Sequence, residues 1–129
     1  MPNASTTATR DLIRRYYELA NTGRWQEWAA LFAPDAVVDE QLAGRIEGRA
    51  ALASIVSGFP GTYSSFRNDP RHVLVEAHRA AVVSHITATS TRGVQVDAEV
   101  ANYFETSDGA ITYMTNMHDT VPFAPVFTD

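Results

Sequence analysis

Hydrophobic residues recur at helical spacing in the first half of the chain and at a period of two in the second half. The helical spacing predicts three helices, at residues 10–20, 25–33 and 49–59, because the apolar side chains of each would share one face. Thr9 is placed to cap the first helix, and Pro34 is placed to end the second. Residues 1–8 are polar and are expected to form a flexible tail.

Alternating apolar and polar residues then predict a run of strands, at residues 36–40, 72–78, 81–91, 94–106 and 110–118. Within 94–106, Val96, Ala98, Val100 and Phe104 would share one face. Pro122 and Pro125 disfavour further regular structure, so residues 120–129 are expected to be a C-terminal tail. Helices followed by antiparallel strands predict an α+β fold with helices on one face of a curved sheet, in a single domain over 1–129.

Composition narrows the possible partners and chemistry. The net charge is −5, and all ten basic residues are scattered arginines, which argues against nucleic acid as a partner because phosphate binding needs a basic face. No apolar run is long enough to span a membrane. The absence of cysteine excludes thiolate chemistry and fits a cytoplasmic location. The four histidines lie on different predicted elements without paired ligand spacing, so no metal site is expected.

Two adjacent carboxylates end the first predicted strand. Alternation allows only one of them to share the face of Ala36 and Val38, and that one is Glu40, while Asp39 points the other way. An enclosed Glu40 could act as a general base, because burial raises the pKa of a carboxyl toward neutral pH. The alternative is that the strand simply ends in water.

Several other polar residues interrupt apolar faces and are candidates for a pocket. Asn102 breaks the strand face that ends at Phe104, and a buried amide must find hydrogen-bond partners or line a polar pocket. Tyr16 lies on an apolar helix face. It could be a core residue whose hydroxyl lies near the edge of the core, or it could donate that hydroxyl to a reacting oxygen. His85 is the best histidine candidate and His118 the next, although a strand histidine is often structural. The expected walls of an apolar ligand pocket are Trp28, Phe59, Phe104, Met114 and Asn116.

Four segments resemble one known family: RYYELANTGRW, LFAPDAVVDE, the Gly44–Gly48 region, and NYFETSDGAITYMTNMHD. Together they resemble the nuclear-transport-factor-2-like superfamily, most closely its SnoaL-like polyketide cyclase and ketosteroid isomerase branch. The resemblance covers roughly residues 10–120. It implies a cone-shaped α+β barrel, with three N-terminal helices packed on a curved, mainly antiparallel sheet around a pocket. It also implies a homodimer formed through the open face of the sheet.

The resemblance assigns roles to individual residues. Against ketosteroid isomerases, the catalytic base falls on Glu40, the oxyanion tyrosine on Tyr16, and the second oxyanion donor on Asn102. Against SnoaL-like cyclases, the catalytic histidine and aspartate fall on Asn102 and Asn116, and an amide cannot act as a general base. Asp119 matches an aspartate near the end of the family's last strand and could orient His118.

These expectations combine into a cofactor-free enzyme acting on an apolar, carbonyl-bearing metabolite of polyketide or steroid type. Glu40 would remove a proton next to the carbonyl, Tyr16 and Asn102 would hold the enolate oxygen, and His85 or His118 would assist proton transfer. One alternative is a dehydratase or an epoxide-opening cyclase on the same scaffold. Another is a module for ligand binding or dimerisation without catalysis, which the amides at positions 102 and 116 favour.

Overall fold

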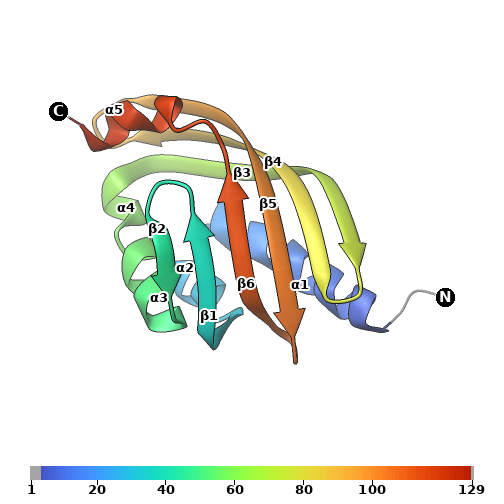
Figure 1. Cartoon of the computed structure of the whole chain (residues 1–129). Coiled ribbons are helices and arrows are strands. Elements are labelled where there is room, and N and C mark those ends of the chain that lie inside the picture. Colours follow the sequence, from blue (N-terminus) through green and yellow to red (C-terminus); the bar gives the residue numbers. More distant parts are fainter. Residues whose placement is uncertain (1–3, 129) are drawn as a thin grey trace.

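A computed structural model describes residues 4–128 and shows one curved sheet with helices on its concave side (Figure 1). The helices are α1 (Ala4–Asn21), α2 (Trp25–Ala29), α3 (Arg49–Val56), α4 (Phe59–Thr62), the 3-10 turn η1 (Val121–Phe123) and α5 (Ala124–Phe127). The strands are β1 (Phe32–Glu40), β2 (Gly44–Glu47), β3 (Tyr63–Glu76), β4 (Arg79–Ser90), β5 (Gln95–Ser107) and β6 (Ala110–Met117).

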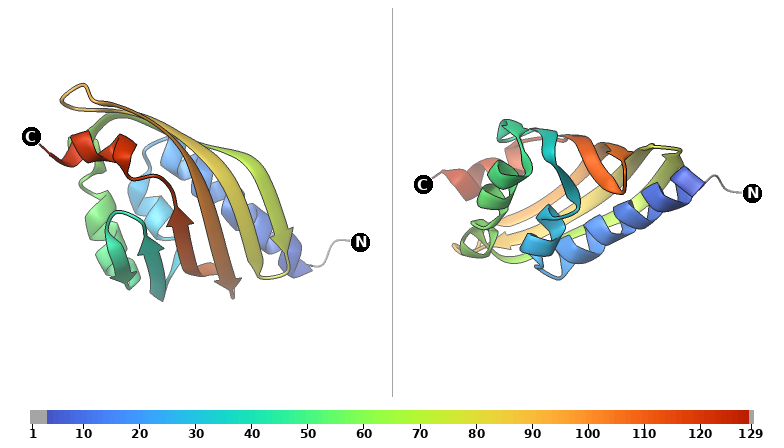
Figure 2. Two further views of the ribbon diagram at one scale, coloured as in Figure 1. Left: turned by 45° about the horizontal axis from the view of Figure 1, so that its top comes forward. Right: turned by 90° about the horizontal axis from the view of Figure 1, so that it is seen from below.

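The sheet has the strand order β2-β1-β6-β5-β4-β3 and does not close into a barrel. All neighbouring strands are antiparallel except β1 and β6, which are parallel. The long strands β3, β4 and β5 bend around α1, and α5 lies at the end of the sheet opposite the start of α1 (Figures 1 and 2). The predicted α+β fold, with helices on one face of a curved and mainly antiparallel sheet, is therefore confirmed.

Alternation along β5 places its apolar side chains inward as predicted. Val96, Ala98, Val100 and Phe104 are buried with Asn102 on the inner face, whereas Asp97, Glu99, Ala101 and Tyr103 face outward. The buried faces of α1 and α2 pack against this concave surface and form the main core, with Ile13, Phe32 and Phe104 almost fully enclosed. Each such side chain contributes roughly 1.5–3 kcal/mol by leaving water. The core thus fixes the inner face of the sheet on which the site is built.

The N-terminal boundary of α1 differs from the prediction. The helix begins at Ala4, so the expected flexible tail is helical from that residue onward, while residues 1–3 lie outside the described part of the chain. Thr9 does not cap the helix. Thr9 lies within α1 and is buried. Its hydroxyl donates a hydrogen bond to the Ala77 carbonyl at 2.7 Å and lies 2.9 Å from the Thr106 hydroxyl. These partners come from the β3–β4 turn and from β5, more than sixty residues away, and no local pattern reveals them.

Three further boundaries differ from the predicted ones. Pro34 lies inside β1, at a register shift between Phe32 and Val37, and does not end α2. This position suits a proline, because a shift in register removes the need for its missing N–H. The predicted helix at 49–59 is divided into α3 and α4, and β3 begins nine residues earlier than predicted.

The C-terminal segment is also more regular than predicted. Prolines at 122 and 125 stand in the first turns of η1 and α5, where a missing N–H costs nothing. Arg92, from the β4–β5 turn, donates from Nη2 to the carbonyls of Pro125, Val126 and Thr128 at 2.8–2.9 Å. Phe123 and Val126 are buried against the sheet. Within residues 4–128, no helix has the length and apolar character needed to cross a membrane.

Candidate active site

A cavity of about 600 Å³ lies between the concave face of the sheet, the helices α1 to α4 and the C-terminal segment. Its lining is mostly apolar and aromatic, with a few polar side chains from β1, β6, β5 and α1. This size and composition are typical of sites for small organic molecules. Eight of the ten residues selected from the sequence line this cavity, and they are Tyr16, Trp28, Glu40, Phe59, Asn102, Met114, Asn116 and His118.

Three of the polar residues form one row across adjacent strands. Asp39 is in register with Thr115, so the next residue on β1, Glu40, stands beside Asn116 on β6. Asn116 in turn is directly opposite Asn102 on β5. Since adjacent strands lie about 4.8 Å apart, a carboxylate and two amides follow one another at that step along the inner face. The parity predicted for Glu40 places it in this row.

The carboxylate of Glu40 is held by backbone amides of the β1–β2 turn. Its Oε2 accepts hydrogen bonds from the N–H of Leu42 at 2.7 Å and of Ala43 at 2.5 Å. The other oxygen, Oε1, lies 3.9 Å from Nε2 of His118. The Glu40 side chain is only 23% exposed, so β1 does not end in open water at this residue. One oxygen is anchored, and the second is turned toward the histidine and the cavity.

His118 is held with one ring nitrogen directed at Glu40. Its Nδ1 lies 2.8 Å from the backbone carbonyl of Asp119, and because a carbonyl only accepts, Nδ1 carries the proton. Nε2 is therefore the ring nitrogen that faces the carboxylate. The ring is 2% exposed and packs against Phe123 at 4.8 Å. Asp119 does orient His118, but through its backbone; its carboxylate bonds the N–H of Val121 at 2.9 Å.

The two asparagines of the row point their amides in opposite senses. Asn116 Oδ1 accepts from the backbone N–H of Gln41 at 3.0 Å, so its NH₂ group faces the other way. Asn102 Nδ2 donates to the Val82 carbonyl at 3.0 Å and to Ser84 Oγ at 2.9 Å, so its oxygen is the free atom. The partners decide both orientations, because a backbone N–H only donates and a carbonyl only accepts. Asn116, and not Asn102, has amide donors to offer to an oxyanion.

Tyr16 contributes a phenol from α1. Its ring packs edge-on against the ring of Phe104, with 5.0 Å between the ring centres, and its centre lies 5.3 Å from that of the Trp28 ring. Within residues 4–128 no side chain or backbone group hydrogen-bonds its hydroxyl, which is not among the fully enclosed unpaired atoms. Burial, with the nearby Tyr17 and the charge of Glu40, raises the pKa of Tyr16 well above its ordinary value. The phenol is therefore a neutral donor that has a free proton and stands near the carboxylate.

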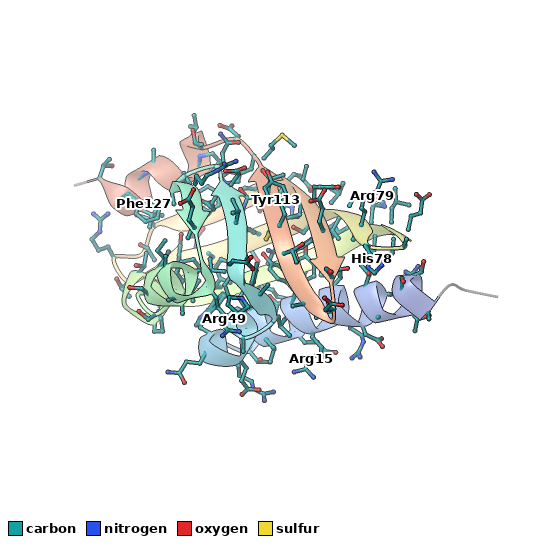
Figure 3. The ribbon with its side chains drawn as sticks, turned by 60° about the horizontal axis from the view of Figure 1, so that its bottom comes forward. Arg15, Arg49, His78, Arg79, Tyr113 and Phe127 are labelled. Carbon is teal, nitrogen blue, oxygen red and sulfur yellow. The ribbon has the colours of Figure 1, made fainter. Side chains whose placement is uncertain are left out.

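Apolar walls surround these polar groups. Trp28, Phe59 and Met114 line the cavity as predicted. Residues that the sequence reasoning left out of the site also line it, and they are Trp25, Tyr63, Asn68, Phe123 and Phe127 (the last is labelled in Figure 3). Trp25 belongs to the same helical stripe as Trp28, so periodicity offered that signal. The apolar residues between the C-terminal prolines were a second, unused signal.

Two predicted site residues are not in the cavity. His85 faces the opposite side of the sheet, where its Nε2 lies 2.7 Å from Asp97 and its Nδ1 2.8 Å from Glu99, so its placement in the pocket is wrong. In β4 it is Val82 and Ser84 that face inward, and alternation turns His85 outward. Phe104 is 0% exposed and is sealed by the ring of Tyr16, so it supports the site from beneath instead of touching a ligand.

Metal chemistry has no obvious set of ligands here. Among the side chains of residues 4–128, no three histidine, aspartate or glutamate groups gather closely enough to hold a metal ion. The groups that do converge are a carboxylate, an imidazole, a phenol and an amide NH₂. Such a set can take a proton, pass it on and donate hydrogen bonds to an oxygen that gains charge.

The chain belongs to the SnoaL-like domain family, whose model matches residues 13–114. This match agrees with the resemblance drawn from the four sequence segments. A comparison with curated proteins finds no match.

Solved structures share the fold. A putative ketosteroid isomerase from Kribbella flavida is 27% identical, with a TM-score of 0.73 over 88% of this chain and 79% of that one. A putative SnoaL-like polyketide cyclase from Jannaschia is 14% identical, with a TM-score of 0.81 over 98% and 95%. An epoxide hydrolase-like protein from M. tuberculosis is 16% identical, with a TM-score of 0.81 over 94% and 90%. The last two likenesses show the fold alone.

Proposed function

We propose that this protein is an enzyme that removes a proton next to a carbonyl group of an apolar metabolite, as the first step of an isomerisation or a cyclisation. The observation that carries the proposal is the row of Glu40, Asn116 and Asn102 at the polar floor of an otherwise apolar cavity. The family match and the 27% identity to a putative ketosteroid isomerase agree with this class of chemistry. The reaction uses only groups of the chain itself.

Glu40 acts as the base in this mechanism. Its free oxygen takes the proton from the carbon next to the carbonyl, and the electron pair of that C–H bond moves into the enolate. His118 Nε2, 3.9 Å from Glu40 Oε1, then accepts the proton from the carboxyl or returns it through the carboxyl to another carbon. Return to another carbon completes an isomerisation, whereas attack of the enolate on a second carbonyl forms a ring.

Tyr16 and Asn116 hold the enolate oxygen. The phenol hydroxyl and the Asn116 NH₂ group both lack an acceptor elsewhere within residues 4–128, and both residues line the cavity. Donors fixed in a dry site stabilise a developing oxyanion without having to reorganise. Asn102, expected from the sequence to be a second donor, has its NH₂ group engaged, so this role passes to Asn116.

The test is hydrogen–deuterium exchange at C2 of 1-tetralone in D₂O, followed by NMR. This small bicyclic ketone carries its acidic C–H beside a carbonyl and fits a cavity of about 600 Å³. The wild-type protein should accelerate the exchange, and Glu40→Gln should lose the acceleration. Binding of the ketone without acceleration by the wild type would instead support the non-catalytic ligand-binding alternative.

A further inference from the structure

Adjacent amides in the polar row have opposite hydrogen-bonding polarity. Asn116 directs its donors toward the cavity because its oxygen is held by the Gln41 N–H. Asn102 directs its acceptor there because its NH₂ group is held by Val82 and Ser84, with the Val100 carbonyl a further 3.4 Å contact. The two residues are directly opposite each other on β6 and β5. A ligand that spans them meets a donor and then an acceptor at one strand spacing.

No group among residues 4–128 hydrogen-bonds the side-chain oxygen of Asn102. Asn102 is 4% exposed overall. Among residues 4–128, the fully buried side-chain atoms without a hydrogen bond are Tyr17 Oη, Trp28 Nε1 and Asn68 Oδ1. Asn102 Oδ1 is not one of them, so this unpaired oxygen keeps some exposed surface. Because Asn102 lines the cavity, this oxygen borders the space that a ligand would fill. An apolar ligand group placed there would strip water from the oxygen without replacing its hydrogen bond, and that costs binding free energy.

We infer that the substrate is a hydroxylated carbonyl compound, whose hydroxyl group donates to Asn102 Oδ1. This inference rests on the proposed function, which places the carbonyl oxygen at Asn116 and the acidic C–H at Glu40. The order along the row is then C–H, carbonyl and hydroxyl, which face Glu40, Asn116 and Asn102 on strands about 4.8 Å apart. Asn102 is a specificity-determining residue that reads the hydroxyl, and not a donor to the enolate.

Two pairs of ligands test this order. In 7-hydroxy-1-tetralone the reacting C2, the carbonyl and the hydroxyl follow one another along one edge of the molecule, as in the row. In 7-methoxy-1-tetralone the oxygen is kept and the donor is lost. Equilibrium binding, measured by calorimetry, should favour the hydroxy compound about fivefold or more. The 6-hydroxy and 6-methoxy pair, whose substituents point away from that edge, should show no such preference.

Variants then assign the preference to one amide. Asn102→Leu, close in size but apolar, should abolish the discrimination between the 7-substituted ketones. Asn116→Leu is the matched control, because it should weaken both ketones equally and leave the preference intact. Circular dichroism and thermal melting establish that each variant is folded. The two ligand pairs also decide the question on the wild-type protein alone, should Asn102→Leu not fold.

The results separate this inference from the proposed function. Equal affinity of the wild type for the 7-hydroxy and 7-methoxy ketones, or a preference that survives in Asn102→Leu, would overturn the reading by Asn102 even if C2 exchange is catalysed. A preference for the 7-hydroxy ketone that is lost only in Asn102→Leu supports recognition of the hydroxyl by Asn102, even if C2 exchange is not catalysed. In that case only the proposed role of Glu40 as the base fails.

Discussion

The two faces of β1 hold neighbouring carboxylates in opposite settings. Asp39, on the outer face, is bound by Arg45 through two hydrogen bonds of 2.8 and 2.9 Å and by the hydroxyl of Tyr113 at 2.7 Å (Tyr113 is labelled in Figure 3). Glu40, on the inner face, forms no ion pair with an arginine of residues 4–128; it is held by two backbone amides and faces a histidine. The outer carboxylate is neutralised by its partners, whereas the inner one keeps an oxygen free for a ligand.

Two histidines, His85 on β4 and His118 just after β6, repeat the contrast. His85 lies on the outer face between two exposed carboxylates, Asp97 and Glu99. His118 lies inside, with one nitrogen fixed by a backbone carbonyl and the other directed at Glu40. Both contact acidic side chains, but only one does so beside a cavity. Contact between a histidine and a carboxylate is therefore not enough to identify a functional site. The pair must also lie on the face of the sheet that borders the cavity.

The largest expected effect separates the adjacent carboxylates. Glu40→Gln should slow C2 exchange of 1-tetralone by about a hundredfold or more, because the base is lost while the shape is kept. Asp39→Asn should leave the rate essentially unchanged, since its side chain faces away from the cavity. Both rates are measured by NMR in D₂O. A comparable loss in Asp39→Asn would remove the distinction between the two faces.

A second prediction compares the neighbouring tyrosines of α1. Tyr16→Phe should slow exchange by about a hundredfold, the usual effect of removing one oxyanion donor. It should not lower the melting temperature, because no protein group among residues 4–128 bonds that hydroxyl. Tyr17→Phe is the matched control: its hydroxyl is sealed away from the cavity, and its rate should equal that of the wild type. Equal rates in all three proteins would exclude Tyr16 from the reaction.

A smaller effect should separate the histidines. His118→Gln should lower the exchange rate by roughly tenfold, less than the loss of the base itself, because Glu40 can still take the first proton. His85→Gln should have no effect on the rate. The same exchange assay measures both, and a loss confined to His85→Gln would show that the wrong face of the sheet has been assigned.

The smallest effect concerns stability and pH. The hydrogen bonds from Arg45, followed by that from Tyr113, lower the pKa of Asp39 from its usual 3.8 to about 2. A pKa that is lower in the folded state means that the pair stabilises the protein above pH 4 and loses this contribution as the pH falls from 4 to 2. The melting temperature of Asp39→Asn should thus lie below that of the wild type at pH 6 and meet it near pH 2.

A control for that prediction is available at another ion pair. Glu76 Oε1 lies 3.3 Å from Arg79 Nη2, and the Glu76 side chain is 85% exposed. Because exposed ion pairs contribute little, Glu76→Gln should change the melting temperature less than Asp39→Asn does. A difference for Asp39→Asn that persists unchanged at pH 2 would contradict the assignment of the stabilisation to the charged carboxylate.

Local sequence patterns predicted those parts of the site that depend on one strand. Alternation alone placed Glu40 inward and Asp39 outward, and it separated the two faces of β5. It did not settle β4, where the adjacent Val82 and Val83 fall on opposite faces and leave the parity of His85 open. The orientation of an amide was out of reach, because the partners of Asn102 and Asn116 come from β4 and from the turn after β1. Thr9 was misread for the same reason.

One measurement tests most directly whether the inner-face groups converge on a single ligand oxygen. The dissociation constant of 2-naphthol, whose phenol oxygen mimics an enolate, would be measured for the wild type, Tyr16→Phe, Asn116→Leu and Tyr17→Phe. We predict saturable binding that weakens severalfold in Tyr16→Phe and in Asn116→Leu and is unchanged in Tyr17→Phe. Binding of equal strength in all four proteins would contradict convergence on one oxygen and leave the cavity as an apolar container.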